Sequence, residues 1–196
     1  MSTSKPQLPA TRRAVSEFFE SALGGDSQVR AYYDEWEEYV VAVVEALHTP
    51  SRTLSTYVTA SLHAAPKVMD GRDIRVELLM VAPQGEGSAA NIVATAVFCV
   101  IKDGWLAAPG VVFPDAVREY LPDTTVPHLM WTEPFDFTDL GTIAVDGLVE
   151  NLHVLQAVPL TERERDFLLE PGFDALSSRL ESAEARHFDL YRVSVC

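Results

Sequence analysis

Hydrophobic and polar positions along this chain follow first a helical period and then a strand period. Residues 11–23 carry apolar side chains three or four positions apart, which predicts a helix, and Gly24-Gly25 directly afterwards favours a C-terminal cap. A second helix is predicted from Asp26 onward, because apolar side chains recur at helical spacing as far as residue 47. These side chains are Val29, Tyr32, Tyr33, Trp36, Val40, Val43, Val44 and Leu47.

Beyond Pro50 the apolar positions alternate, as is typical of strands. Residues 53–64 are rich in Thr, Val and Tyr, and residues 74–80 place apolar side chains at every second position. Asp70-Gly71 between them predicts a turn, so we expect two neighbouring antiparallel strands. Residues 89–102 are apolar on nearly all sides and predict a buried helix.

The next part of the chain combines a long loop with further strands. Four prolines in residues 105–127 remove backbone donors and exclude regular structure over most of that stretch, which predicts a long ordered loop. Strands are then predicted at residues 128–132, 141–145 and 151–159.

Helices are predicted to return near the C-terminus. Thr161 and Glu164 have the spacing of a capping box, so a helix should begin there. Pro171-Gly172 interrupts this helix, and a short terminal strand is predicted at residues 188–195. Together the segments predict one α+β domain.

Composition agrees with a folded domain in the cytoplasm. The 196 residues are 47% hydrophobic and 22% charged, which suits a single core. The longest strongly apolar run, residues 92–101, has about half of the roughly 20 residues that a transmembrane helix needs. Residues 1–10 are polar, lack the apolar stretch of a secretory signal, and are expected to be disordered. We expect residues 11–48 to form a helical extension packed on a main domain of residues 49–196.

The charge restricts the kinds of partner. The formal net charge of -14 argues against direct binding of nucleic acid or anionic membranes, because both need a basic surface. It leaves a basic protein as a partner. The two cysteines, Cys99 and Cys196, form neither a disulfide framework nor a cluster with metal-ligand spacing.

No residue pattern indicates a catalytic, cofactor or metal site. The five histidines lack the i, i+4 spacing of a helical zinc site, and neither a G-x-S-x-G elbow nor a phosphate-binding glycine loop is present. His63, His128 and His153 lie in predicted strands, where hydrogen-bonded structural roles are favoured over metal binding. We therefore predict no cofactor, no metal and no catalytic residue.

Two groups of side chains are candidates for contact with another protein. One is the acidic face of the predicted second helix, and the other is the aromatic and acidic part of the proline-rich loop. The candidates are Asp34, Glu35, Glu37, Glu38, Trp105, Asp115, Glu119 and Tyr120.

Several short pieces of sequence occur in the order typical of one family. They are TYVTASL (56–62), RVELL (75–79), WLAAPG (105–110), residues 128–134, LQAVPLTERE (155–164), residues 172–180 and residues 189–194. In this respect residues 53–195 resemble the suppressor of fused (SUFU) domain family in its bacterial single-domain form. The most specific pieces are Pro109-Gly110 and the strand exit Gln156-x-x-Pro159, to which the resemblance assigns structural roles. The residues before position 49 are less typical, and residues 85–90 lack the tryptophan-containing stretch of the family.

The resemblance implies a fold and a choice of functions. It implies an α+β domain with a mixed, largely antiparallel sheet flanked by helices. A related animal domain sequesters a transcription factor by gripping a peptide segment, and bacterial members are interpreted as immunity proteins that neutralise a toxin. The main hypothesis is therefore an immunity-type protein that sequesters a basic toxin. The alternatives are a regulatory or scaffold domain that binds a peptide at a sheet edge, and an enzyme that uses the strand histidines with carboxylates.

Overall fold

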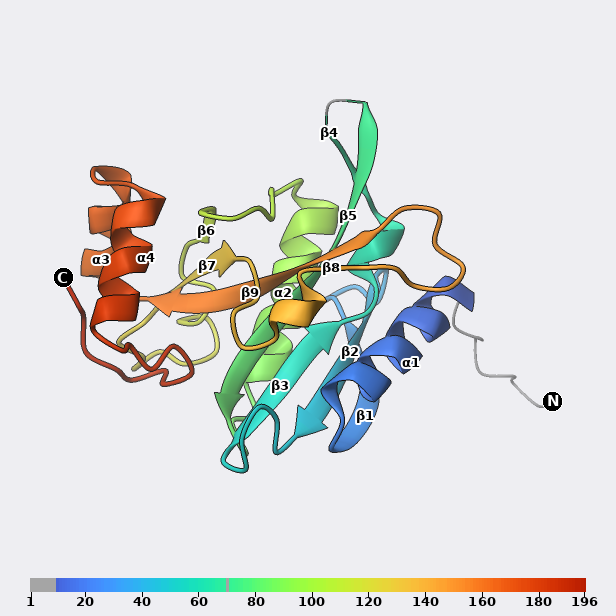
Figure 1. The fold of residues 1–196 in the computed structure, drawn as a ribbon, viewed down its shortest axis with the longest axis horizontal. Coiled ribbons are helices and arrows are strands. Elements are labelled where there is room, and N and C mark those ends of the chain that lie inside the picture. The colour runs from blue at the N-terminus through green and yellow to red at the C-terminus, as the bar shows by residue number, and fades with distance from the viewer. Residues whose placement is uncertain (1–9, 70) are drawn as a thin grey trace.

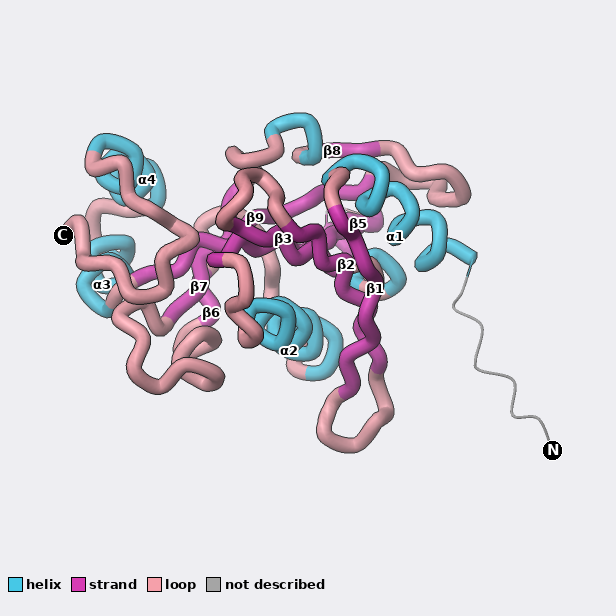
Figure 2. Tube along the Cα trace, turned by 90° about the horizontal axis from the view of Figure 1, so that it is seen from below, coloured by secondary structure: helices cyan, strands magenta, loops and turns pink. Residues whose placement is uncertain are grey.

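A nine-stranded mixed sheet runs through the computed structural model, which describes residues 10–69 and 71–196 (Figures 1 and 2). Its main strand order is β1-β2-β3-β5-β9-β7-β6, with β4 added to β5 and β8 to β9. The strands are β1 (Asp26–Tyr33), β2 (Val40–Leu47), β3 (Leu54–Thr59), β4 (Lys67–Met69), β5 (Arg72–Pro83), β6 (Val112–Phe113), β7 (His128–Thr132), β8 (Thr142–Ile143) and β9 (Leu152–Leu160). Among these described strands only β5 and β9 pair in parallel, so the predicted mixed, largely antiparallel α+β fold is confirmed.

Two long helices cover opposite faces of the sheet (Figure 2). Helix α1 (Ala10–Leu23) buries Val15 and Phe19 against one face, and α2 (Ala89–Lys102) buries most of its surface against the other. Both helices confirm the predictions for residues 11–23 and 89–102. Because successive strand residues point to opposite faces, β2 and β5 supply side chains to both cores.

The prediction of a helix from Asp26 onward is wrong. Residues 26–47 form an antiparallel hairpin in which β1 pairs with β2 from Asp26↔Leu47 to Tyr33↔Val40. Helical and strand periods both fit the apolar positions here, but β2 also pairs with β3, which buries Val41 and Val43 on one face and Val44 on the other. Pairing with β3 and the high content of β-branched valine therefore favour strand over helix in this segment.

The centre of the sheet follows the predictions closely. Strands β3 and β5 are antiparallel neighbours, as predicted, and β7 and β9 begin within one residue of the predicted positions. Of the turn predicted at Asp70-Gly71, Asp70 lies outside the described residues. Strand β9 joins β5 to β7, so this one strand connects both halves of the chain.

The predicted long loop of residues 105–127 is ordered and packed against the sheet. It contains only the two-residue strand β6, and its Trp105 and Phe113 rings lie 4.8 Å apart, with Phe113 in turn 5.4 Å from Trp131. Trp131 is fully buried, so it is a core residue rather than part of a recognition surface.

The C-terminal segment closes the end of the sheet at β7 and β9. The capping box of Thr161 and Glu164 is present at the start of α3 (Glu162–Leu169), and α4 (Phe173–Ser182) follows after the predicted interruption. The prediction of a terminal strand at residues 188–195 is wrong. Side chains rather than a backbone ladder hold this segment, because Arg192 donates to Glu164 and to the carbonyl of Pro159. Among the described helices, none is both long and apolar enough to cross a membrane.

Candidate protein-binding surfaces

The three histidines predicted in strands lie apart, and His63 is not in a strand because β3 ends at Thr59. His153 lies near the start of β9, whereas His128 pairs with Leu160 at its end, about 23 Å away at the usual rise per strand residue. His63 lies in a short 3-10 turn (Leu62–Ala64), where its Nδ1 is 2.6 Å from the carboxylate of Glu77. His153 pairs with Val76, so its side chain and that of Glu77 point to opposite faces of the sheet.

His128 occupies the one cluster among the described residues that has the geometry of a possible metal site. The Nδ1 atom accepts a hydrogen bond from the backbone amide of Asp115 at 2.9 Å, so the ring hydrogen of the neutral imidazole is on Nε2. The Nε2–H group donates a hydrogen bond to the Glu162 carboxylate at 2.9 Å. Both ring nitrogens are therefore engaged within the protein. This hydrogen bond and the nearby Arg118 lower the pKa of Glu162 to about 2. The arrangement ties the loop to the start of α3.

Glu77 is a fully buried carboxylate with four donors. It accepts hydrogen bonds from the Thr59 hydroxyl, from the amides of Leu62 and His63, and from the His63 ring. Buried carboxylates need such compensation, and here it fixes the chain where it leaves β3. Alternation in the sequence around Glu77 indicates a surface position and does not reveal this network.

The four acidic residues predicted on a helix face lie instead in the turn between β1 and β2. This turn projects beyond the rest of the molecule (Figure 2). The side chains of Glu35, Glu37 and Glu38 are exposed, and none has a basic partner within 4.0 Å among the described residues. Trp36 lies between them with 71% of its surface exposed, although the helical spacing predicts it on a buried apolar stripe.

Asp34 differs from its acidic neighbours because it is buried. Its carboxylate accepts the amide of Tyr39 at 2.8 Å and pairs with Lys102 of α2 at 2.7 Å. The Lys102 ammonium also lies 5.9 Å from the centre of the Tyr39 ring. Lys102, followed by the Tyr39 amide, lowers the pKa of Asp34. The expectation that Asp34 is exposed was wrong: it fixes the turn to the end of α2, while its neighbours remain available for contact.

Three of the four candidates from the proline-rich loop lie beside the same helix, whereas Asp115 lies beside His128. Trp105 follows α2 directly and is half-buried against Phe113, and the Tyr120 hydroxyl lies 2.5 Å from that of Thr95 on α2. Burial, followed by the charges of Asp103 and of the exposed Glu119, raises the pKa of the Cys99 thiol on α2. Asp115 is exposed but is engaged by Arg118 at 2.5 Å. The projecting turn (34–39), Trp105, Glu119 and Tyr120 together form what we call the α2 surface.

The residues singled out by the family resemblance have definite contacts. Gly110 adopts a positive φ of 81°, and a Cβ there would lie 3.4 Å from the Phe173 ring. Gln156 is fully buried and accepts the amides of Phe135 and Asp136 at 3.1 and 3.2 Å. The Pro159 carbonyl accepts from Arg192 at 2.7 Å, whereas Pro109 is exposed beside an open groove.

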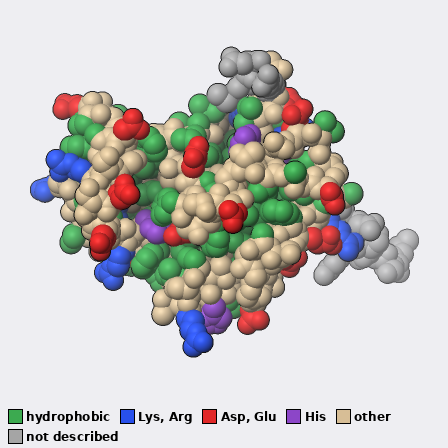
Figure 3. Space-filling model, in the orientation of Figure 1, with side chains coloured by type: hydrophobic (Ala, Val, Ile, Leu, Met, Phe, Trp, Pro, Cys, Tyr) green, Lys and Arg blue, Asp and Glu red, His purple; other side chains and the backbone are tan. Residues whose placement is uncertain are grey.

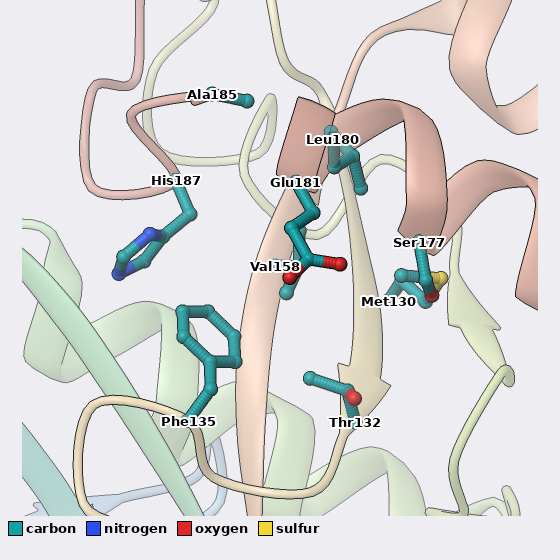
Figure 4. Close-up of a pocket in the computed structure, with 9 residues that line it drawn as sticks. All are labelled: Met130, Thr132, Phe135, Val158, Ser177, Leu180, Glu181, Ala185 and His187. Carbon is teal, nitrogen blue, oxygen red and sulfur yellow. The ribbon is translucent and has the colours of Figure 1, made fainter. Parts of the chain in front are cut away.

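A pocket that the sequence did not reveal lies between α4 and the sheet (Figure 4). Its volume is about 420 Å³, with Met130 and Val158 from the sheet, Leu180 and Glu181 from α4, and Phe135 at one side. The Phe135 and His187 rings meet edge to face, with their centres 4.6 Å apart. Hydrophobic side chains also reach the surface on this side of the molecule (Figure 3). The lining comes from three separate stretches of the chain, residues 130–135, 158 and 177–187, so no local motif marks it.

Comparison with known proteins gives one family and a consistent fold. The sequence profile of the family described as "Suppressor of fused protein (SUFU)" matches residues 35–193. Immunity protein YqcF of Bacillus subtilis (strain 168) is 28% identical over 177 residues, which cover 89% of this chain and 91% of that protein.

Solved structures of similar shape come from the same family. The crystal structure of a putative SUFU homologue from Neisseria gonorrhoeae has a TM-score of 0.74 at 14% identity, covering 95% of this chain and 97% of that one. A chain of the Sufu–Fu complex has a TM-score of 0.59 at 13% identity, with coverage of 95% and 91%. Drosophila Suppressor of Fused has a TM-score of 0.54 at 13% identity; the match covers 86% of this chain and 42% of the Drosophila chain.

Proposed function

The chain belongs to the suppressor of fused family, and on this premise we propose that it is a non-catalytic, immunity-type protein that neutralises a basic protein toxin by sequestering it in the cytoplasm. The similarity to an immunity protein over nearly the whole length of both chains supports this role. The similar fold of a chain in the Sufu–Fu complex supports a protein partner more generally.

The α2 surface is the observation that carries the proposal. Its projecting turn presents the exposed Trp36 among Glu35, Glu37 and Glu38, none of which has a basic partner in the described part of the chain. Exposed tryptophan is common among residues that dominate binding energy, and uncompensated carboxylates attract a basic partner over long range. The net charge of -14 acts in the same direction.

The test is binding to the protein encoded by the neighbouring gene. Expression of that protein alone should arrest bacterial growth, and expression together with this chain should restore it. Calorimetry on the purified pair should show a complex, and stopped-flow mixing should show that its association slows as salt is raised. A neighbouring protein that is not toxic, or that does not bind, contradicts the proposal.

Trp36→Ala provides the sharper test of the surface. We expect it to weaken the complex by about tenfold or more, because a central aromatic anchor typically contributes over 1 kcal/mol. Tyr191→Ala is the matched control, since Tyr191 is also an exposed aromatic residue, 54% accessible, but lies in the C-terminal segment. Equal effects of the two substitutions would place the interface elsewhere.

A regulatory domain that holds a peptide segment is the second candidate. The pocket beside α4 favours it, because a hollow of about 420 Å³ with an apolar floor and the carboxylate of Glu181 suits an anchoring side chain with a basic neighbour. In this case the partner would be harmless to the cell when expressed alone, which separates the two candidates.

A further inference from the structure

Strand β1 is an outer strand of the sheet that, in the described part of the chain, lacks several of the usual protections of an edge. Among the described residues it pairs only with β2, and each of its eight residues is exposed or half-buried. Edge strands are normally shortened, interrupted by proline or a bulge, lined with charged side chains, or covered by another element. Here the pairing with β2 is continuous over the whole strand, and the strand contains no proline. Its charged residues are Asp26 at the start and Arg30, which is paired with Glu45 of β2.

An uncovered edge of this length offers backbone hydrogen bonds to another chain. Alternate residues of an edge strand direct their N–H and C=O groups away from the sheet. At the usual rise per residue, the eight residues of β1 extend over about 27 Å. This length suits the addition of one extended segment, in which backbone bonds provide affinity and alternate side chains provide selectivity.

The side chains of β1 define what kind of segment fits. Val29, Ala31 and Tyr33 share the face covered by α1 and are exposed at the edge, so they form an apolar stripe. On the other face, Gln28 and Arg30 are held by Glu45 of β2, at 2.8 and 3.4 Å. A partner strand would therefore need apolar side chains on one face only.

The end of β1 adds a charge requirement. Tyr33 leads directly into the projecting turn with Trp36 and its three unpaired glutamates. A second copy of this chain would bring another 14 negative charges to the edge, whereas a basic segment would neutralise the turn. Charge thus selects a basic protein over self-association.

We infer that β1 is a docking edge for an extended segment of a basic protein partner, which adds to the sheet with apolar side chains beside Val29, Ala31 and Tyr33 and with basic side chains beside the glutamates of the turn. The inference rests on the proposed function and specifies how the partner is held. It places the contact in the backbone of β1 as well as in the side chains of the turn.

Synthetic peptides test the edge without knowledge of the natural partner. The probes are Lys-Lys-Thr-Val-Thr-Val-Thr-Val and its reverse, which cover both strand directions. With the full isotope-labelled chain, we expect one of them to shift the NMR signals of β1 and to slow amide exchange at alternate β1 residues by about tenfold or more. A peptide with glutamates in place of the lysines should not bind. Shifts confined to other elements would overturn the inference.

Removal of backbone donors separates strand addition from simple charge attraction. A peptide N-methylated at alternate residues keeps its charge but cannot form the ladder, so one of the two possible methylation patterns should bind about tenfold more weakly or worse. If both methylated forms bind as well as the parent peptide, the contact is not a β-strand addition.

A matched pair of variants tests the same point on the chain itself. Arg30→Pro and Ala31→Pro remove neighbouring donors, of which one faces β2 and the other faces outward. The variant that retains the thermal stability of the parent protein should be the one that loses peptide binding. Retained binding in that variant would refute the inference.

Failure of strand addition at β1 and failure of the proposed function give different results. If the toxin binds and Trp36→Ala weakens it, but the stable proline variant binds normally, the proposed function stands and strand addition fails. If the toxin does not bind while the basic peptide still adds to β1, the edge is a docking site and the immunity role fails. Dimerisation of the chain through β1, seen by light scattering, would also overturn the inference.

Discussion

The two edges of this sheet are built in opposite ways. At one edge, β1 is eight residues long and pairs only with β2 among the described elements. At the other, β6 has only two residues. Its Val112 packs in a cluster with side chains of α3 and α4, and the proline-rich loop that contains β6 bonds to α3 and to the C-terminal segment. Among the described residues, the same sheet therefore has one edge held by several segments and one left open.

Buried polar contacts close the protected end. Glu164 accepts the amides of Thr161 and Val195 and both terminal nitrogens of Arg192, and its side chain is fully buried. Burial raises the pKa of Glu164, but Arg192 and the two amides outweigh this and leave the pKa below its usual range. The β1 end has a looser counterpart in Arg30, Gln28 and Glu45 at the surface. This difference between the two ends agrees with the proposed docking of a partner segment at β1.

Removal of the buried guanidinium should have the largest effect on stability. Arg192→Met leaves the Glu164 carboxylate buried without its counterion, so we expect a loss of about 3–5 kcal/mol in the free energy of unfolding, measured by urea denaturation. Arg30→Met is the matched control at the open edge. The Arg30 side chain is 57% exposed, so its loss should cost about 1 kcal/mol or less. Similar losses in both variants would contradict the comparison.

Substitution of a buried amide should have an intermediate effect. Gln156→Leu preserves the approximate side-chain size but leaves the amides of Phe135 and Asp136 without their acceptor, which should cost about 1–3 kcal/mol. Gln28→Leu, at the open edge, removes an exposed hydrogen bond to Glu45 and should change stability by about 0.5 kcal/mol at most. Urea denaturation measures both. A larger effect at Gln28 would show that the open edge is the more rigid one.

The carboxylate of Glu162 should make the stability of the fold depend on pH. His128 and Arg118 lower the pKa of Glu162 to about 2 from an ordinary 4.5, so its carboxylate stabilises the fold above pH 4.5, and this contribution is lost as pH falls from 4.5 toward 2. Glu162→Gln should therefore reduce stability near pH 7 by about 1 kcal/mol or less, because the side chain is half-exposed. The difference from the parent protein should shrink below pH 4.5.

Glu181→Gln is the control for the pH experiment, since no ion pair forms at Glu181 in the described residues. Thermal unfolding across pH 2–7 measures both variants. A constant difference between Glu162→Gln and the parent protein at every pH would show that His128 and Arg118 do not stabilise the charged form.

A charged residue at the open edge should have the smallest effect. Val29→Lys adds a lysine where 37% of the residue surface is already exposed, so we expect the free energy of unfolding to change by about 0.5 kcal/mol or less. Val44→Lys is the matched control, because Val44 is the cross-strand partner of Val29 and is fully buried. It should destabilise the fold severely. A large loss at Val29 would mean that the edge is covered.

Local patterns in the sequence determined much of this fold. Three features act only through residues that are close in sequence: the capping box at Thr161, the apolar run of α2 and the prolines of the loop. The start of α3, the helix α2 and the irregular loop were therefore predictable. The alternation around β3 and β5 was likewise sufficient to predict their pairing. The family and its mixed sheet were predictable because short motifs occur in a fixed order along the chain.

Only the tertiary structure decided the hairpin, the end of the chain and the surfaces for contact. The apolar positions of residues 26–47 fit both a helical and a strand period, and the segment forms strands because β2 pairs with β3. The C-terminal segment is held by the ion pair of Arg192 with Glu164 and does not form the predicted strand. This contact was not predictable because the two residues are 28 positions apart in sequence. The pocket beside α4 and the open edge of β1 depend on which segments meet in space. Short-range spacing specifies elements, but burial and exposure follow from long-range packing, which a single sequence does not display.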